Sequence, residues 1–312
     1  MAILTRLAPT RLSIGHGEAL DSYLERFAQA NDITPLQLIT LISPSGSHSP
    51  ESYAMSFPTA GFLDGVHELT GLEVEDLRHS TLQHFADGLP FDFTSATTSP
   101  TGMHPAVAAA QWFPLRGTQV CPQCLAENGQ WNLSWRLPIV TICLIHRRYL
   151  APICSSCGKR FRTRQGALLR PNLGASHECG NTTAGRNHCT HPVIENQAHA
   201  VDESYLEVAR TVEKALAGEY VALAERLVKP SKYLADLRAV ATQLLTTCIP
   251  TSSTREPRAA VQWEPPGAKG RHFRKGGANR VRPPDRPEMR AVLLRHAHTI
   301  LVQGDWVLSL AS

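Results

Sequence analysis

The feature that most constrains how this chain can fold is a run of regularly spaced metal-ligand residues between positions 121 and 157. The run contains three pairs whose members are separated by two residues: Cys121 and Cys124, Cys143 and His146, and Cys154 and Cys157. Two ligands at this spacing bind one metal ion from a tight turn, and two such pairs fill a tetrahedral Zn²⁺ site. The spacing therefore predicts small zinc-stabilised units in the middle of the chain.

The first predicted site takes its four ligands from the first two pairs: Cys121, Cys124, Cys143 and His146. A catalytic zinc ion keeps one position open for water. Here protein ligands fill every position and no cluster of carboxylates lies nearby in the sequence, so we predict a structural zinc ion. The alternative, buried cysteines without a metal, requires two correctly spaced pairs to arise by chance.

The second predicted site begins with Cys154 and Cys157 and needs two further ligands from the loop that follows. The candidates in that loop are His177, Cys179, His188, Cys189 and His191. Deprotonated thiolates bind zinc more strongly than neutral imidazole does, so Cys179 and Cys189 are our first choice. The close pairs formed by His177 with Cys179, or by Cys189 with His191, remain alternatives. We expect two Zn²⁺ ions per chain.

Eight cysteines in 312 residues would also suit a secreted disulfide scaffold. The N-terminal segment, however, lacks the apolar stretch of a signal peptide, because Arg6, Pro9 and Arg11 interrupt it. No stretch approaches the roughly 18 apolar residues that a membrane helix needs. We therefore expect a cytoplasmic protein whose paired cysteines bind metal instead of forming disulfides.

Two helix–turn–helix patterns are predicted in the N-terminal third. Residues 18–42 carry an apolar stripe at helical spacing, then a turn and a second helix. Residues 63–77 repeat the pattern of residues 24–38. Such pairs can present a recognition helix to DNA. The plain αα-hairpin is the alternative that we favour, because the acidic residues of 73–79 would face the phosphates.

Two tryptophans, Trp131 and Trp135, lie between the two halves of the first site on a predicted short helix. Isolated zinc knuckles have little hydrophobic core of their own, so we predict that the two rings pack beside the metal. A contact with a partner or with nucleic acid is the alternative, because aromatic residues are enriched at binding hot spots.

The chain as a whole is predicted to be mostly α-helical with small zinc-stabilised modules, in five segments. These are a helical region (1–93), a double zinc-finger module (106–195), a second helical region (200–250), a flexible basic linker (251–287) and a short C-terminal segment (288–312). The net charge is only +4, yet basic residues concentrate near the linker. Those expected to contact DNA phosphates are Lys269, Arg271, Arg274, Lys275, Arg280 and Arg282. A solvated tether is the alternative.

Recognisable catalytic machinery is missing from the sequence. Neither G-x-x-x-x-G-K-[ST] nor G-x-G-x-x-G occurs, and no Ser, Cys or Lys lies in a known nucleophile motif. The well-placed cysteines are all assigned to metal. We therefore name no catalytic residue and expect that the protein is not an enzyme.

Residues 120–161 resemble the TniQ family of transposition proteins. They contain a CPxCL knuckle, a W-x-x-SW-R-x-P segment, a C-x-x-H pair and a CxxCG sequence. The run GEALDSYLERFA near the N-terminus is similar to the opening helical region of that family, and residues 233–245 resemble its downstream helix. Many relatives complete the second zinc site with a close C-x-C-G, whereas here the corresponding loop is long.

The resemblance implies a non-catalytic adaptor in DNA transposition, which helps to choose the target site. Such an adaptor links target DNA to a transposase and its AAA+ ATPase, and some relatives dock instead on an RNA-guided complex. The runner-up prediction is a zinc-dependent transcription regulator that binds DNA through its helix–turn–helix units. A zinc hydrolase or nuclease is the third class.

Overall fold

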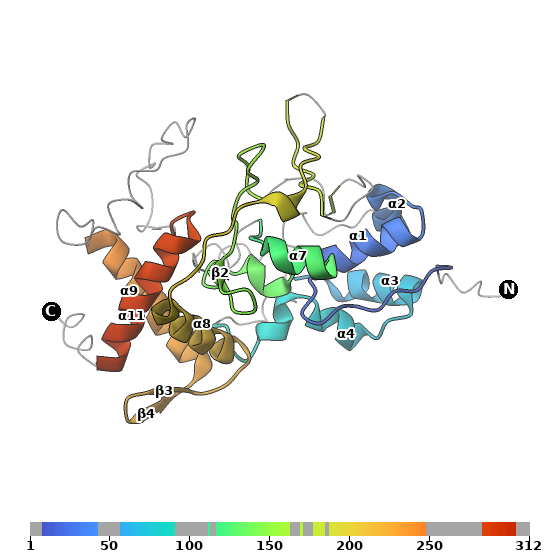
Figure 1. Cartoon of the computed structure of the whole chain (residues 1–312). Coiled ribbons are helices and arrows are strands. Elements are labelled where there is room, and N and C mark those ends of the chain that lie inside the picture. The colour runs from blue at the N-terminus through green and yellow to red at the C-terminus, as the bar shows by residue number, and fades with distance from the viewer. Residues whose placement is uncertain are drawn as a thin grey trace, which may run out of the picture.

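The computed structural model describes residues 8–42, 57–90, 112, 117–162, 169–170, 177–184, 187–247 and 283–303. These ranges contain eight α-helices and two short antiparallel strand pairs, which confirms the predicted, mostly α-helical fold. Figure 1 shows the N-terminal helices at one end, the C-terminal helices at the other, and the cysteine-bearing segments between them. Every helix in the described ranges is too short or too polar to cross a membrane.

Four helices form the N-terminal end: α1 (Leu20–Ala30), α2 (Pro35–Ile42), α3 (Ala60–Thr70) and α4 (Val74–His79), followed by the 3-10 helix η1 (Leu82–Phe85). The two predicted helix pairs share one hydrophobic core. Equivalent positions of the repeated pattern are buried in it, namely Leu24 with Leu63, and Leu38 with Leu77. The repeat is therefore a packing repeat, in which each pair covers the apolar side of the other.

Local sequence signals determine where these helices begin and how closely they approach. The Gln37 amide donates to Thr34 Oγ1 at 3.2 Å, and the Thr34 amide donates to Gln37 Oε1 at 2.8 Å. This reciprocal capping box starts α2. On α3, a Cβ atom at Gly65 would lie 2.2 Å from the carbonyl oxygen of Ile42, so only glycine allows α3 to pack this closely on the end of α2.

The middle of the chain is built from short elements. They are α7 (Pro122–Asn128), η2 (Leu133–Arg136), β1 (Ile142–Cys143), β2 (Arg148–Tyr149) and η3 (Val193–Glu195). Strands β1 and β2 are antiparallel, with Cys143 opposite Arg148. The sequence predicted one short helix carrying both tryptophans, but η2 contains only Trp135, because Trp131 instead bonds to α1 through its backbone.

The C-terminal end consists of three helices and a hairpin: α8 (Glu203–Leu216), β3 (Val221–Leu223), β4 (Arg226–Val228), α9 (Pro230–Thr247) and α11 (Pro287–Gln303). Helices α8 and α9 both lie within residues 200–250, which the sequence predicted to be helical. Helix α11 packs against both of them. The C-terminal segment, whose role the sequence did not indicate, is therefore part of the helical end of the molecule.

Ordered contacts are present just before the predicted linker boundary at 287. Asp285 pairs with Arg160 at 2.7 Å, and α11 begins at Pro287, so ordered packing starts before that boundary. The division of the chain into five domains stays a prediction.

One hydrophobic core joins the middle of the chain to the C-terminal helices. Its buried members include Cys121 and Cys154 from the middle and Leu237 and Leu294 from α9 and α11. Zinc knuckles have little core when isolated, but the cysteine-bearing module is not isolated here. The module shares a large core because helices distant in sequence pack onto it.

Candidate metal centres

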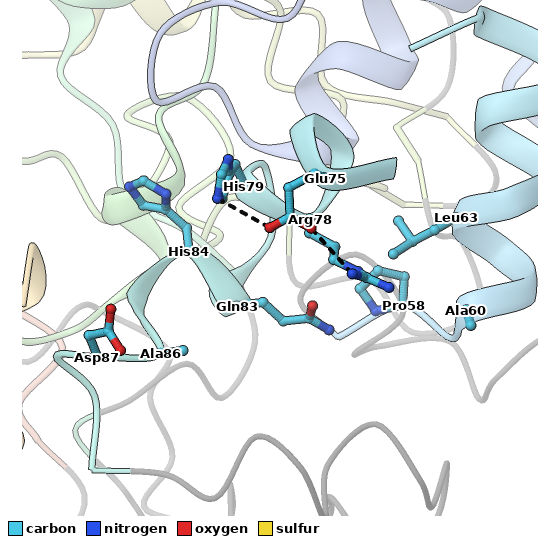
Figure 2. A pocket seen from close by; sticks show the side chains of 10 residues that line it. All are labelled: Pro58, Ala60, Leu63, Glu75, Arg78, His79, Gln83, His84, Ala86 and Asp87. Carbon is cyan, nitrogen blue, oxygen red and sulfur yellow. Dashed lines mark hydrogen bonds and ion pairs between the residues drawn. The ribbon is translucent and has the colours of Figure 1, made fainter. Parts of the chain in front are cut away.

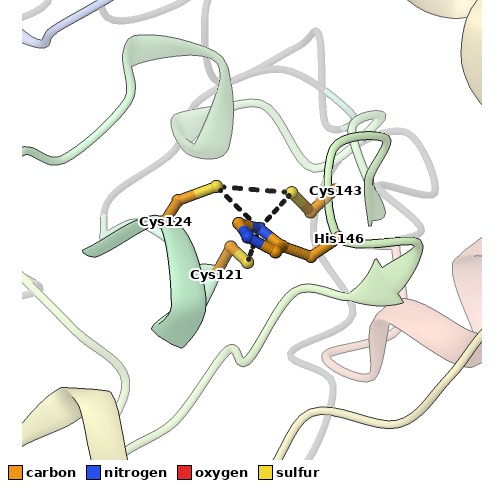
Figure 3. A group of neighbouring side chains, drawn as sticks. All are labelled: Cys121, Cys124, Cys143 and His146. Atoms are coloured by element: carbon orange, nitrogen blue, oxygen red, sulfur yellow. Dashed lines mark hydrogen bonds between the residues drawn. The ribbon is translucent and has the colours of Figure 1, made fainter. Parts of the chain in front are cut away.

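The first candidate centre lies where α7 meets the turn between β1 and β2. Cys121 is the N-cap of α7 and Cys124 lies in its first turn, while Cys143 ends β1 and His146 lies in the turn that follows. Figure 3 shows the four side chains converging, with the His146 ring among the three sulfurs. The Cys124 and Cys143 sulfurs are 3.5 Å apart, and His146 Nδ1 lies 3.4 Å from Cys121 Sγ and 3.2 Å from Cys124 Sγ.

These distances fit a four-coordinate metal ion. Zinc–sulfur bonds of about 2.3 Å place two sulfurs of a tetrahedral site about 3.8 Å apart. The ligand atoms of Cys121, Cys124, Cys143 and His146 all lie within 4.8 Å of one another. A sulfur–sulfur separation of 3.5 Å excludes a disulfide between Cys124 and Cys143, because that bond measures about 2.05 Å.

A carboxylate that the sequence analysis missed contacts the histidine of this centre. Glu127 Oε1 lies 2.9 Å from His146 Nε2, on the side of the ring opposite the sulfurs. Glu127 is on α7, three residues after Cys124, so one helix carries both groups. Residues three apart share a helix face, but the sequence gives no local sign that Glu127 meets His146, which lies 19 residues further along the chain.

The second candidate centre gathers four cysteines: Cys154, Cys157, Cys179 and Cys189, whose sulfurs lie within 4.8 Å of one another. Cys154 and Cys189 are 3.9 Å apart, and Cys157 and Cys179 are 3.8 Å apart, close to the tetrahedral edge given above. The long loop brings its two cysteines together by pairing with itself, because the Gly180 amide donates to the Cys189 carbonyl at 2.8 Å.

The structure does not bring the alternative histidines into this cluster. His191 Nε2 faces Ser155 Oγ at 2.9 Å, and His177 uses its backbone carbonyl to accept from Val193. His188, the remaining candidate, has a buried Nδ1 with no hydrogen-bond partner. The geometry thus favours the first-choice set of Cys179 and Cys189, while the metal itself remains a proposal.

The tryptophan segment beside the first centre is tied to α1. The Trp131 amide donates to Ser22 Oγ at 3.0 Å, and Ser22 donates to Glu18 Oε1 at 2.7 Å. The Leu133 amide donates to the Gly17 carbonyl at 2.8 Å. The two stretches of sequence that resemble the TniQ family therefore meet in space and stabilise each other.

Buried ion pairs reinforce this junction. Asp21 of α1 pairs with Arg136, and with Arg162 at 2.5 Å, while Glu25 pairs with Arg162 at 2.9 Å and with Arg170 at 2.8 Å. Burial alone would raise the pKa of Asp21, but the Arg136 and Arg162 guanidiniums outweigh it and hold that pKa well below its usual range. Asp21 therefore remains ionised.

The burial of both tryptophans favours the predicted packing over a partner contact. Trp131 is 1% exposed and Trp135 is 5% exposed. The Arg162 guanidinium lies over the Trp131 ring, 4.5 Å from its centroid, and Phe161 packs against its edge. Both rings are core side chains, and they contact each other edge to face with 6.5 Å between their centroids.

A cavity of about 650 Å³ opens beside α4 and η1. Figure 2 shows its polar lining, in which Glu75 faces both Arg78 and His79. Glu75 pairs with Arg78 at 3.2 Å and with His79 at 3.5 Å. On α4, the second helix of the second predicted helix–turn–helix, Arg78 therefore pairs with a carboxylate of the same helix.

The basic residues predicted to contact DNA lie outside the described residues. They are Lys269, Arg271, Arg274, Lys275, Arg280 and Arg282.

The fold and the two centres define a mostly helical protein with two closed four-ligand Cys/His clusters. The sequence model of the TniQ family matches residues 9–150, so this part of the chain is a TniQ domain and the predicted resemblance is confirmed there. The match associates the chain with DNA transposition. Comparison with curated proteins gave no match. The first centre lies inside the matched range, and the second lies beyond it.

Proposed function

We propose that the chain is a non-catalytic adaptor in DNA transposition, which helps to select the target site and links it to the transposition machinery. The observation that supports this most is the TniQ match over residues 9–150. That range contains the first centre and the junction of α1 with the tryptophan segment. The expected partners are target DNA, a transposase and an AAA+ ATPase, or an RNA-guided targeting complex.

We propose that both centres hold structural Zn²⁺. In each of them four protein side chains converge, which leaves no position for the water that a catalytic zinc ion requires. The nearby carboxylate of Glu127 contacts His146 and does not face an open position. Mixed thiolate and imidazole ligands, or four thiolates, suit zinc better than magnesium or calcium, which prefer oxygen.

The test of the adaptor role is a reconstituted insertion assay. It uses the full chain with a transposase and an AAA+ ATPase, and compares the insertion sites sequenced with and without the chain. We expect the chain to change where insertions occur, and to cleave neither DNA nor nucleotides by itself. Identical insertion profiles in both reactions would overturn the adaptor role.

The regulator alternative rests on the two helix pairs at the N-terminal end. Binding to genomic DNA fragments separates it from the adaptor, because a regulator must bind one promoter tightly without transposition proteins. Tight and specific promoter binding, together with no effect on insertion, would favour the regulator.

A further inference from the structure

We propose that Glu127 is a positioning residue of the first centre, which fixes the ring of His146 so that Nδ1 is the metal-binding nitrogen. This inference rests on the proposed zinc occupancy of that centre. It concerns a residue that lies outside the four-ligand set and that the spacing of the ligands did not indicate.

The chemistry of the two groups determines the arrangement. A carboxylate only accepts hydrogen bonds, so Nε2 must carry the proton that is shared with Glu127 at 2.9 Å. A neutral imidazole carries one N–H, which leaves a lone pair on Nδ1. That atom is the one facing Cys121, Cys124 and Cys143, at 3.4, 3.2 and 3.7 Å. The hydrogen bond and the ligand role thus select the same tautomer.

Helix α7 carries Glu127 and Cys124 and is capped by Cys121, so one element positions the carboxylate relative to two of the ligands. Cys121 caps α7, Cys124 lies in its first turn and Glu127 in its last, whereas His146 comes from the turn after β1. The hydrogen bond from His146 to Glu127 therefore links α7 to the turn after β1, the same two elements that a bound metal ion would link through its ligands. Carboxylates that orient a histidine ligand in this way commonly change metal affinity about 10- to 100-fold when removed.

The exposure of the two side chains sets the expected size of the effect. The Glu127 side chain is 58% exposed, whereas that of His146 is 14% exposed. Water can replace part of the lost hydrogen bond, so we expect the lower end of that range, about tenfold. Glu127→Gln should lose much less, because its amide oxygen can still accept from Nε2–H.

The experiment measures zinc affinity by chelator competition in the full chain and its variants. Glu127→Ala should release one of two zinc ions at about tenfold lower chelator concentration, while the four-cysteine centre serves as an internal reference. Glu195→Ala is the matched control, because it removes an exposed carboxylate from η3, which packs on α7, and should behave as wild type. Nitrogen NMR of the His146 ring should show the proton on Nε2.

The outcomes separate this inference from the zinc proposal. Wild-type protein with no zinc at the first centre would overturn both. Two zinc ions in wild type, with Glu127→Ala indistinguishable from it, would overturn the positioning role alone. So would an NMR spectrum that places the metal on Nε2. Circular dichroism checks that each variant keeps its helices.

Discussion

At the scale of single residues, spacing identified the candidate metal ligands, but it did not identify the side chains that contact and position the residues of these segments. The pairs around Cys121 and Cys154 were predictable because a tight turn places both members of a pair at one point. Glu127 and Asp21 were not, since each acts on a residue from a distant part of the sequence. Glutamates and aspartates are common on helix surfaces, so no local pattern distinguishes the ones that find such partners.

Ligand substitutions test both centres. Cys189→Ser should leave about one zinc ion per chain, because it removes a thiolate from the second centre, and Cys143→Ser should do the same at the first. His177→Ala should retain two, since His177 is not in the cluster. Metal analysis of anaerobically purified protein reads out each count. Loss of one zinc ion in His177→Ala would instead favour the alternative in which His177 is a ligand of the second centre.

The buried ion pairs predict a large effect from a small change. Asp21→Asn should destabilise the protein by about 3 kcal/mol, because it leaves two buried guanidiniums without one of their counter-charges. Glu75→Gln breaks a pair whose side chains are 45% and 64% exposed, and should cost less than about 1 kcal/mol. Urea unfolding compares the two variants. Similar losses of stability in the two variants would contradict the inference that buried ion pairs contribute more to stability than exposed ones.

At the scale of elements, helices with a clear apolar stripe were predictable and the hairpin β3–β4 was not. The apolar residues of α1 recur at helical spacing and form its buried face: Leu20, Tyr23, Leu24 and Phe27. Residues 221–228 are rich in alanine, leucine, glutamate and arginine, which are strong helix formers. The chain nevertheless turns at Ala224, with φ of 50°, and packs Val221 and Leu223 into the main core. Burial overrides propensity there.

Two glycines on α3 form a matched pair of tests. Gly65→Ala should destabilise the protein by about 1–3 kcal/mol, because the new methyl group would displace α3 from α2. At Gly61 a Cβ atom meets nothing within 4 Å, so Gly61→Ala should stabilise by up to about 1 kcal/mol through helix propensity. Thermal unfolding measures both. Equal effects at the two positions would show that α3 is not held against α2 as described.

At the scale of the whole molecule, the sequence predicted the parts but not the core that they share. Zinc-ligand patterns and helical stripes are local, whereas the packing of α11 on α8 and α9 joins residues that are far apart in the chain. Arg290 of α11 is buried, donating to the Pro138 carbonyl at 2.7 Å and to Gln119 Oε1 at 2.5 Å. The local sequence of α11 around Arg290 gives no sign of such partners.

The proposed DNA binding also belongs to this scale, because it depends on the summed charge of a segment. Replacing the six basic residues between Lys269 and Arg282 with glutamine should reduce the slope of log K against log salt by up to about five, because each phosphate that a basic side chain neutralises adds about 0.9 to that slope. Arg78→Gln on α4 is the control and should leave the slope unchanged. An unchanged slope in the six-fold variant would favour the solvated tether.

The hydrogen bond between Arg290 and Gln119 has a consequence for how the protein is made. The two residues are 171 positions apart, and Gln119 lies just before the first metal-ligand pair. A ribosome therefore releases the cysteine-rich middle well before the helix that completes its surroundings has been synthesised. During that interval the apolar faces of α8 and α9 lack α11. We expect chaperones to bind this nascent stage, and a message that stops before α11 to yield a product that proteases remove.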